Sequence, residues 1–168
     1  NKKENKLELF FPTPIGNNST FYMKIDATCR PTDNILEGLY FDVAPEGAPP
    51  QIISQCQQWG FQRIMPFIDD CRAKCTWRTT IEASSAYTHL ISNGDVCKET
   101  NPRGVPEPLE NNTSRKRITY VNNIPMPPYL FVAAVGTWEE VSDFVVLPNG
   151  RKVKLEYLVP PGKANGAK

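Results

Sequence analysis

The chain has 168 residues, 40% of them hydrophobic, which is enough for one domain with a core of its own. Nineteen Lys and Arg against eighteen Asp and Glu leave a formal charge of +1, so the chain lacks the basic field that attracts nucleic acid or an anionic membrane. No apolar run approaches membrane-spanning length. We therefore expect neither a nucleic-acid partner nor a membrane span.

The first part of the chain shows short strand patterns between turns, as the sixteen prolines and ten glycines favour. Residues 1–20 are expected to form an N-terminal extension with an edge strand at Leu7–Phe11, which Pro12 ends. Phe21–Ala27 alternates apolar and polar residues, which predicts a half-buried strand at the start of the domain proper. Gly38–Val43 predicts the strand that returns beside it.

Residues 54–70 contain four glutamines among large apolar side chains, with neither strand alternation nor a helical stripe. Gly60 permits a sharp turn, and Pro66 ends any helix that starts before it. The large apolar side chains are expected to be buried, namely Trp59, Phe61, Met65 and Phe67. We interpret the stretch as a folded loop that presents its amides into a cleft or an interface. An ordinary connection with solvated glutamines is the alternative.

Four segments in the middle of the chain are predicted strands: Cys75–Ala83, His89–Ser92, Asp95–Lys98 and Arg115–Asn122. The first has the Thr, Trp and Ile content of a strand, and the last alternates apolar and polar residues. Asn93-Gly94 is the strongest short hairpin signal, and it predicts that the second and third of these segments pair with each other. Glu99–Ser114 is polar and rich in turn residues, which predicts a surface loop.

The last part of the chain begins with its most continuous apolar run, Tyr129–Val135, which predicts a strand buried on both faces. Val141–Leu147 and Lys152–Leu158 predict two strands joined by a turn at Pro148–Gly150. The domain proper is expected over residues 21–162, with a tail at 163–168. The whole pattern predicts an antiparallel all-β domain, a sandwich or saddle-like sheet with at most one short helix, near Asp69–Lys74.

Five cysteines at irregular spacing argue against a disulfide framework and for reduced thiols. We expect an intracellular protein, with mitochondrion and plastid as the organellar options, although Asn-x-Ser/Thr sequons keep secretion open. Cys71 and Cys75 have a spacing that could begin a zinc site, but no second pair follows and His89 is the single histidine. We therefore expect no metal and no cofactor. A Cys nucleophile is disfavoured too, because no cysteine lies beside His89 in sequence.

Several short motifs follow one another in order: Leu36–Tyr40, Gln55–Gln57, Gly60–Ile64, Phe67–Asp69, Leu90–Gly94 and Pro127–Gly136. Each is unspecific alone. Together, over residues 21–162, they resemble the N-terminal β domain of the aminopeptidase N family of zinc metallo-aminopeptidases, particularly its bacterial and organellar branch. The domain is expected to be incomplete, because the family has several strands before the segment that matches Phe21–Tyr40.

The resemblance implies a saddle-like β domain that covers a separate zinc-dependent catalytic domain. It implies that Gln55 helps line the pocket for the first substrate side chain, and that Gln57 stands where the family has a Glu that binds the substrate α-ammonium. A carboxylate–ammonium hydrogen bond contributes about 1.5–3 kcal/mol, against about 0.5–1.5 for a neutral one. Gln57 therefore weakens recognition of a free amine. Gly136-Thr137-Trp138 is a smaller departure from the family's Gly-Asp-Phe.

The chain contains neither the Gly-x-Met-Glu-Asn nor the His-Glu-x-x-His motif that the family's catalytic domain supplies. We therefore assign no catalytic residue and expect no peptidase activity from the isolated chain. One hypothesis is a non-catalytic structural module, an accessory subunit whose partners are other protein chains of a larger, organellar assembly. The other is a piece of an active zinc aminopeptidase, whose loop at 54–70 helps line the pocket for the substrate N-terminus and whose partner is the zinc domain.

Overall fold

The computed structural model describes residues 6–33 and 35–167 and confirms the antiparallel all-β class. Its strands are β1 Gly38–Asp42, β2 Gln51–Gln55, β3 Cys75–Ser84, β4 His89–Ser92, β5 Asp95–Val96, β6 Glu107–Leu109, β7 Asn112–Met126, β8 Ala133–Gly136, β9 Glu139–Val146 and β10 Lys152–Val159. The helical segments described are the 3-10 turns η1 Phe61–Arg63, η2 Pro128–Leu130 and η3 Ala164–Ala167. None of these helices is long enough to span a membrane. Residues 69–74 form turns, so the short helix allowed there is not formed.

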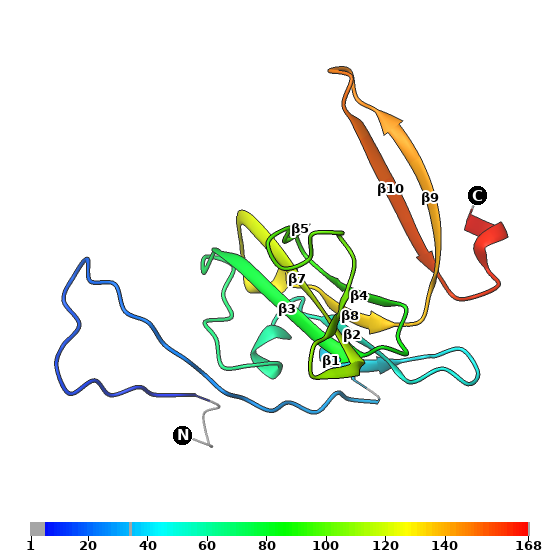
Figure 1. Cartoon of the computed structure of the whole chain (residues 1–168). Coiled ribbons are helices and arrows are strands. Elements are labelled where there is room, and N and C mark those ends of the chain that lie inside the picture. The colour runs from blue at the N-terminus through cyan, green and yellow to red at the C-terminus, as the bar shows by residue number, and fades with distance from the viewer. Residues whose placement is uncertain (1–5, 34, 168) are drawn as a thin grey trace.

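The strands form three antiparallel sheets (Figure 1). One has the order β1-β2-β8-β4, and a second has the order β3-β7-β5, with β6 also paired to β7. Tyr120 of β7 donates its hydroxyl to the Leu90 carbonyl of β4 at 2.7 Å and so joins these two sheets. The core draws on both of them, with Leu90, Ile118 and Ala134 buried. The third sheet is the β9–β10 hairpin, which extends away from the other two (Figure 1).

Several strand predictions are confirmed where the signal is local. The segment predicted at Cys75–Ala83 is β3, and its partner β7 extends the predicted Arg115–Asn122 in both directions. Their side chains pair across the ladder, for example the hydroxyls of Thr80 and Thr119 at 2.9 Å. The hairpin predicted around Pro148–Gly150 is β9–β10.

The two N-terminal strand predictions are wrong. Leu7–Phe11 and Phe21–Ala27 are extended but belong to no strand, and Phe21 and Met23 are exposed. Alternation makes a segment suitable for a sheet, but a strand also needs a neighbour whose backbone groups complete the ladder. In the described part of the chain, no segment pairs with these residues.

The hairpin predicted at Asn93-Gly94 is also wrong, because β4 pairs with β8 whereas β5 pairs with β7. Asn93 donates its side-chain amide to the Leu130 carbonyl at 3.1 Å and accepts the Val132 N–H at 2.6 Å. Gly94 has a φ of +94°, and a Cβ there would lie 2.3 Å from the Val121 carbonyl oxygen. The dipeptide thus carries the chain from one sheet to the other.

The continuous strand predicted at Tyr129–Val135 forms only from Ala133 onward. Its first part is the turn η2, and Leu130 is exposed. The surface loop predicted at Glu99–Ser114 contains strand β6 and the fully buried Asn101. Both predictions rested on composition, apolar in the first segment and polar in the second, but tertiary hydrogen bonding decided the local conformation.

Candidate functional site

Residues 54–70, which we call the Gln-rich loop, begin at the end of β2. Close contacts fix both ends of the first turn of this loop. The Ser54 hydroxyl accepts a hydrogen bond from the Ala133 N–H of β8 at 2.8 Å. The Gly60 N–H donates to the Cys56 carbonyl at 2.9 Å. A Cβ at Gly60 would lie 2.2 Å from the Gln55 carbonyl oxygen, so only glycine fits this approach.

Phe61 anchors the loop in the core. Its side chain is 1% exposed. It meets the rings of Phe67, Trp77 and Phe131 edge-to-face, with centroid separations of 5.2, 5.3 and 5.1 Å. Edge-to-face contact sets the positive edge of one ring against the negative face of the next. Because Trp77 lies in β3 and Phe131 leads into β8, one side chain ties the loop to both sheets.

The two glutamines predicted to form the site lie at the start of this turn. Gln55 is half-buried at the end of β2, and its Nε2 donates to the Gln57 carbonyl oxygen at 3.4 Å. Gln57 and Gln58 are exposed, and the peptide bond between them is cis. The structure therefore brings Gln55 and Gln57 together, through the backbone of Gln57 rather than its side chain. Their role in binding a substrate stays a prediction.

Two of the side chains expected to be buried are exposed, Trp59 at 54% and Phe67 at 41%. Trp59 belongs to the exposed part of the turn before Gly60, and Phe67 contacts the core ring of Phe61 while staying partly open to solvent. The neighbouring Ile68 is 74% exposed. We call Trp59, Phe67 and Ile68 the apolar edge of the loop. Sequence reasoning missed it, although the clustering of apolar residues without periodicity was its signal.

Charged groups hold the remainder of the loop. The Asp69 carboxylate accepts the Gln62 N–H at 3.0 Å, and Arg63 pairs with Glu37 at 2.6 Å. Burial, together with the charge of Asp69, raises the pKa of the Cys56 thiol to about 11. Cys56 is thus protonated at neutral pH and is a poor nucleophile.

His89 occupies a structural position. Its Nδ1 shares a hydrogen bond with the Thr88 hydroxyl at 2.8 Å, and its ring centroid lies 6.1 Å from that of Trp138. Burial lowers the pKa of His89. These contacts join His89 to no cysteine. Within residues 6–33 and 35–167, no group of three or more His, Cys, Asp or Glu side chains gathers around a possible metal position.

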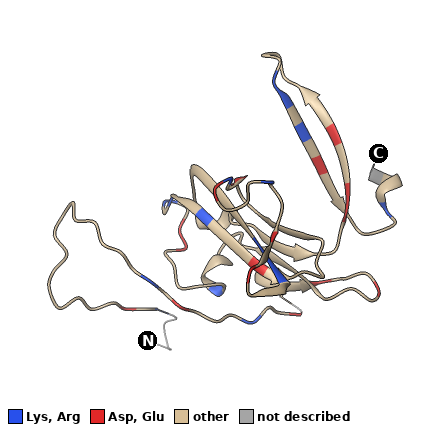
Figure 2. Ribbon diagram, viewed as in Figure 1, with Lys and Arg blue, Asp and Glu red and all other residues tan. Residues whose placement is uncertain are grey.

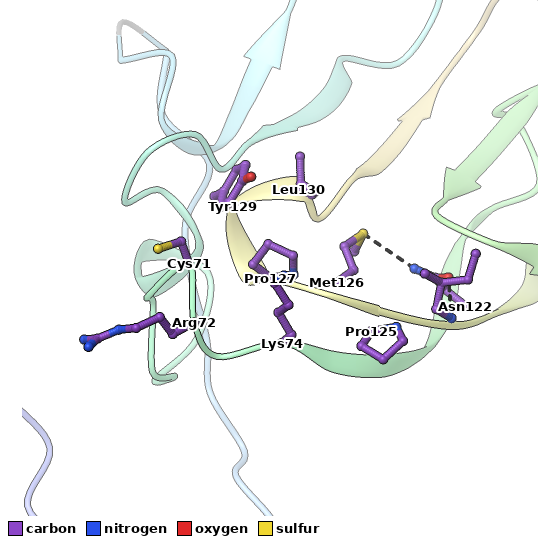
Figure 3. Close-up of a pocket in the computed structure, with 10 residues that line it drawn as sticks. Cys71, Arg72, Lys74, Asn122, Pro125, Met126, Pro127, Tyr129 and Leu130 are labelled. Atoms are coloured by element: carbon purple, nitrogen blue, oxygen red, sulfur yellow. Dashed lines mark hydrogen bonds between the residues drawn. The ribbon is translucent and has the colours of Figure 1, made fainter.

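A pocket of about 940 Å³ lies between the turn at 71–74 and the end of β7 (Figure 3). The guanidinium of Arg72 is already bound to Asp70 at 2.9 and 3.0 Å, which lowers the pKa of that carboxyl to about 2. On the other side Asn122 donates to the Met126 sulfur at 3.5 Å. Among the described residues that line it, there is no carboxylate and no histidine, and the polar side chains are those of Cys71, Arg72, Lys74, Asn122 and Tyr129.

The sequence agrees with one protein family over most of its length. Residues 1–130 match the peptidase M1 N-terminal domain. The chain belongs to the M1 peptidase family. This M1 domain is 27% identical over 148 residues to aminopeptidase N of Caulobacter vibrioides, which covers 88% of the chain and 15% of that protein. It is 23% identical over 140 residues to leukotriene A-4 hydrolase of Xenopus laevis, which covers 82% of the chain and 21% of that protein.

The fold of the M1 domain also resembles that of a solved aminopeptidase. It is similar to Legionella pneumophila aminopeptidase A, solved in complex with aspartic acid, with a TM-score of 0.62 and 26% identity over 77% of this chain and 14% of that one. The resemblance drawn from the ordered motifs is therefore confirmed. The chain spans 15% and 21% of the lengths of the two curated relatives. The activities of those relatives are therefore properties of much longer proteins.

Proposed function

We propose that this M1 N-terminal domain acts as a non-catalytic interaction module that docks onto another protein through the apolar edge of the Gln-rich loop. One observation carries the proposal: the loop is firmly anchored yet leaves large apolar groups in solvent. Phe61 is 1% exposed, whereas Trp59 and Ile68 of the same loop are 54% and 74% exposed. Aromatic and aliphatic groups held on a rigid support are typical centres of protein–protein interfaces.

The partner in this proposal is another protein chain of a larger intracellular or organellar assembly. Gln57 favours an assembly without peptidase function, because a neutral amide stands where the family resemblance places an ammonium-binding Glu. A second candidate rests on the exposure of Gln57 and Gln58 beside Gln55. In it the partner is a zinc-dependent catalytic domain, and the loop helps line the pocket for the substrate N-terminus.

The docking proposal is tested by rebinding the full chain to the assembly recovered from its native source. Removing a central interface side chain costs about 2 kcal/mol or more, so Trp59→Ala and Ile68→Ala should each weaken binding by about thirtyfold or more. Val43→Ala, which truncates an 86% exposed side chain after β1, is the matched control and should leave the affinity unchanged. Equal affinity for all three variants would contradict docking through the apolar edge.

The two candidates are separated by calorimetric titration of a short peptide with a free N-terminus into that assembly. The interaction-module proposal expects no peptide binding, with wild-type chain or with Gln57→Glu. The aminopeptidase candidate expects binding that tightens about fivefold to tenfold in Gln57→Glu, because a carboxylate restores the charge partner. Gln58→Glu adds the same charge one residue later and controls for its general effect. Tightening confined to Gln57→Glu would overturn the first proposal.

A further inference from the structure

The two faces of the β9–β10 hairpin differ in polarity: one is mainly apolar, and the other carries most of the charged residues. On one face Val145 lies opposite Val153 and Val141 opposite Tyr157, whereas Leu155 and Val159 lie opposite the carboxylates Asp143 and Glu139, so this face is apolar along β10 and mixed along β9. The other face carries Glu140, Lys152, Lys154 and Glu156, and Figure 2 shows where charged residues fall along β9 and β10. There Lys154 bonds to Glu140 at 2.8 Å and also to Glu156.

This hairpin is a sheet of only two strands, and no described strand pairs with the outer edge of either one. An isolated two-stranded hairpin is marginally stable, and its unpaired N–H and C=O groups are a template for another strand. The turn fixes which backbone groups of β10 face β9 and which face outward. The Leu147 N–H donates to the Arg151 carbonyl at 2.9 Å, so these two residues form a hydrogen-bonded pair. Since hydrogen-bonded pairs alternate along an antiparallel ladder, odd-numbered residues of β10 face β9 and even-numbered residues direct their backbone groups outward.

The two strands differ in what their edges can accept. β9 carries three acidic residues and no basic one, so a second β9 would be repelled: Glu139, Glu140 and Asp143. β10, by contrast, alternates apolar residues with charges of both signs, in the sequence Lys152-Val-Lys-Leu-Glu-Tyr-Leu-Val159. A strand of this kind can pair with itself.

We propose that two copies of this chain associate by antiparallel pairing of their β10 edges, in the register that sets Leu155 opposite Leu155 of the second copy. In this register Lys154 lies opposite Glu156 of the second copy, and by symmetry the reverse. Val153 likewise lies opposite Tyr157. The hydrogen-bonded pairs fall on even-numbered residues, whose backbone groups are the outward ones. The product is a four-stranded sheet, β9-β10-β10-β9, whose two central strands present Val153, Leu155 and Tyr157 on one face, flanked by Asp143 of each β9.

Charge favours this register over its neighbours, because it contains opposite-charge pairs and no like-charge pair. Centring the pair one residue earlier also sets Lys152 opposite Glu156, but it sets Lys154 opposite Lys154. Centring it one residue later sets Glu156 opposite Glu156 and gives no opposite-charge pair within β10. Like charges directly opposite each other are destabilising, whereas opposite charges stabilise a cross-strand pair. The Lys154–Glu156 pair occurs twice in the symmetric dimer, so a single substitution changes two contacts.

The proposal is tested by light-scattering mass measurement of the full chain during size exclusion, over a concentration series. The wild-type chain should give the mass of two copies. Lys154→Glu and Glu156→Lys each place like charges opposite each other at two positions. Each should raise the dissociation constant of the dimer about tenfold or more. An equimolar mixture of these two variants should recover the dimer, because each Glu then faces a Lys of the other variant.

Two control variants isolate the interface. Glu46→Lys makes the same charge change as Glu156→Lys at an exposed position between β1 and β2 and should leave the dimer intact. Glu140→Gln removes the negative charge that faces Lys154 from β9 without touching the pairing register, and it should also leave the dimer intact. Circular dichroism establishes that each variant stays folded. A monomeric wild-type chain, a dimer that survives both single charge reversals, or a mixture that stays monomeric would each overturn self-pairing.

Discussion

Truncating Phe61 should remove the support of the Gln-rich loop. The side chain is 1% exposed and lies 5.1–5.3 Å, between ring centroids, from three other aromatic rings. A fully buried Phe removes about 200 Å² from water, which at about 25 cal/mol per Å² contributes roughly 5 kcal/mol. Measured Phe→Ala costs in cores are about 3–5 kcal/mol, because the cavity relaxes only in part. We expect Phe61→Ala to lower the free energy of unfolding by about 3–5 kcal/mol.

The assay is urea unfolding followed by tryptophan fluorescence and circular dichroism. With a slope near 2 kcal/mol per M, the midpoint should fall by about 2 M in Phe61→Ala. Phe61→Leu keeps most of the apolar volume and loses the ring contacts, so it should cost less and remain measurable even where the Ala variant does not fold. Phe10→Ala truncates an 89% exposed ring and should stay within about 0.5 kcal/mol of wild type. Equal midpoints for the Phe10 and Phe61 variants would refute the anchoring argument.

Two further outcomes follow from the titratable groups. Because burial and Asp69 raise the pKa of Cys56 to about 11, iodoacetamide at pH 8 should modify the exposed Cys71 long before Cys56, as peptide mass mapping would report, and equal rates would contradict a protected Cys56. The bonds from Lys154 and Ser142 lower the pKa of Glu140 to about 2, from an ordinary value of 4.5. A depressed carboxyl pKa stabilises the folded state above the unfolded pKa, so this contribution should be lost as the pH falls from about 4.5 to about 2. Urea midpoints across that range should drop less in Glu140→Gln than in wild type, and parallel profiles would count against the pairing.

The sequence by itself determined those elements whose signals are local. In β3, Thr and aromatic content was sufficient, and the turn at Pro148–Gly150 placed the β9–β10 hairpin without outside help. The order of the motifs likewise predicted the family, which the match over residues 1–130 confirms, because a series of short motifs in a shared order is specific even where each motif alone is weak. The loop at 54–70 was predicted as a folded loop for the same reason: Gly60 and Pro66 limit regular structure there, and only the short turn η1 forms between them.

Tertiary structure decided everything that depends on which partner a segment meets. Asn93-Gly94 has the residues of a hairpin turn, but the hydrogen bonds of Asn93 with the residues before β8 and the close approach of Gly94 to β7 send the chain into another sheet. Phe21–Ala27 has the alternation of a strand and, among the described residues, no ladder to join. Trp59 is as apolar as Phe61, yet one lies in solvent and the other in the core. Composition states what a residue prefers, whereas burial and pairing depend on long-range contacts that no local pattern contains.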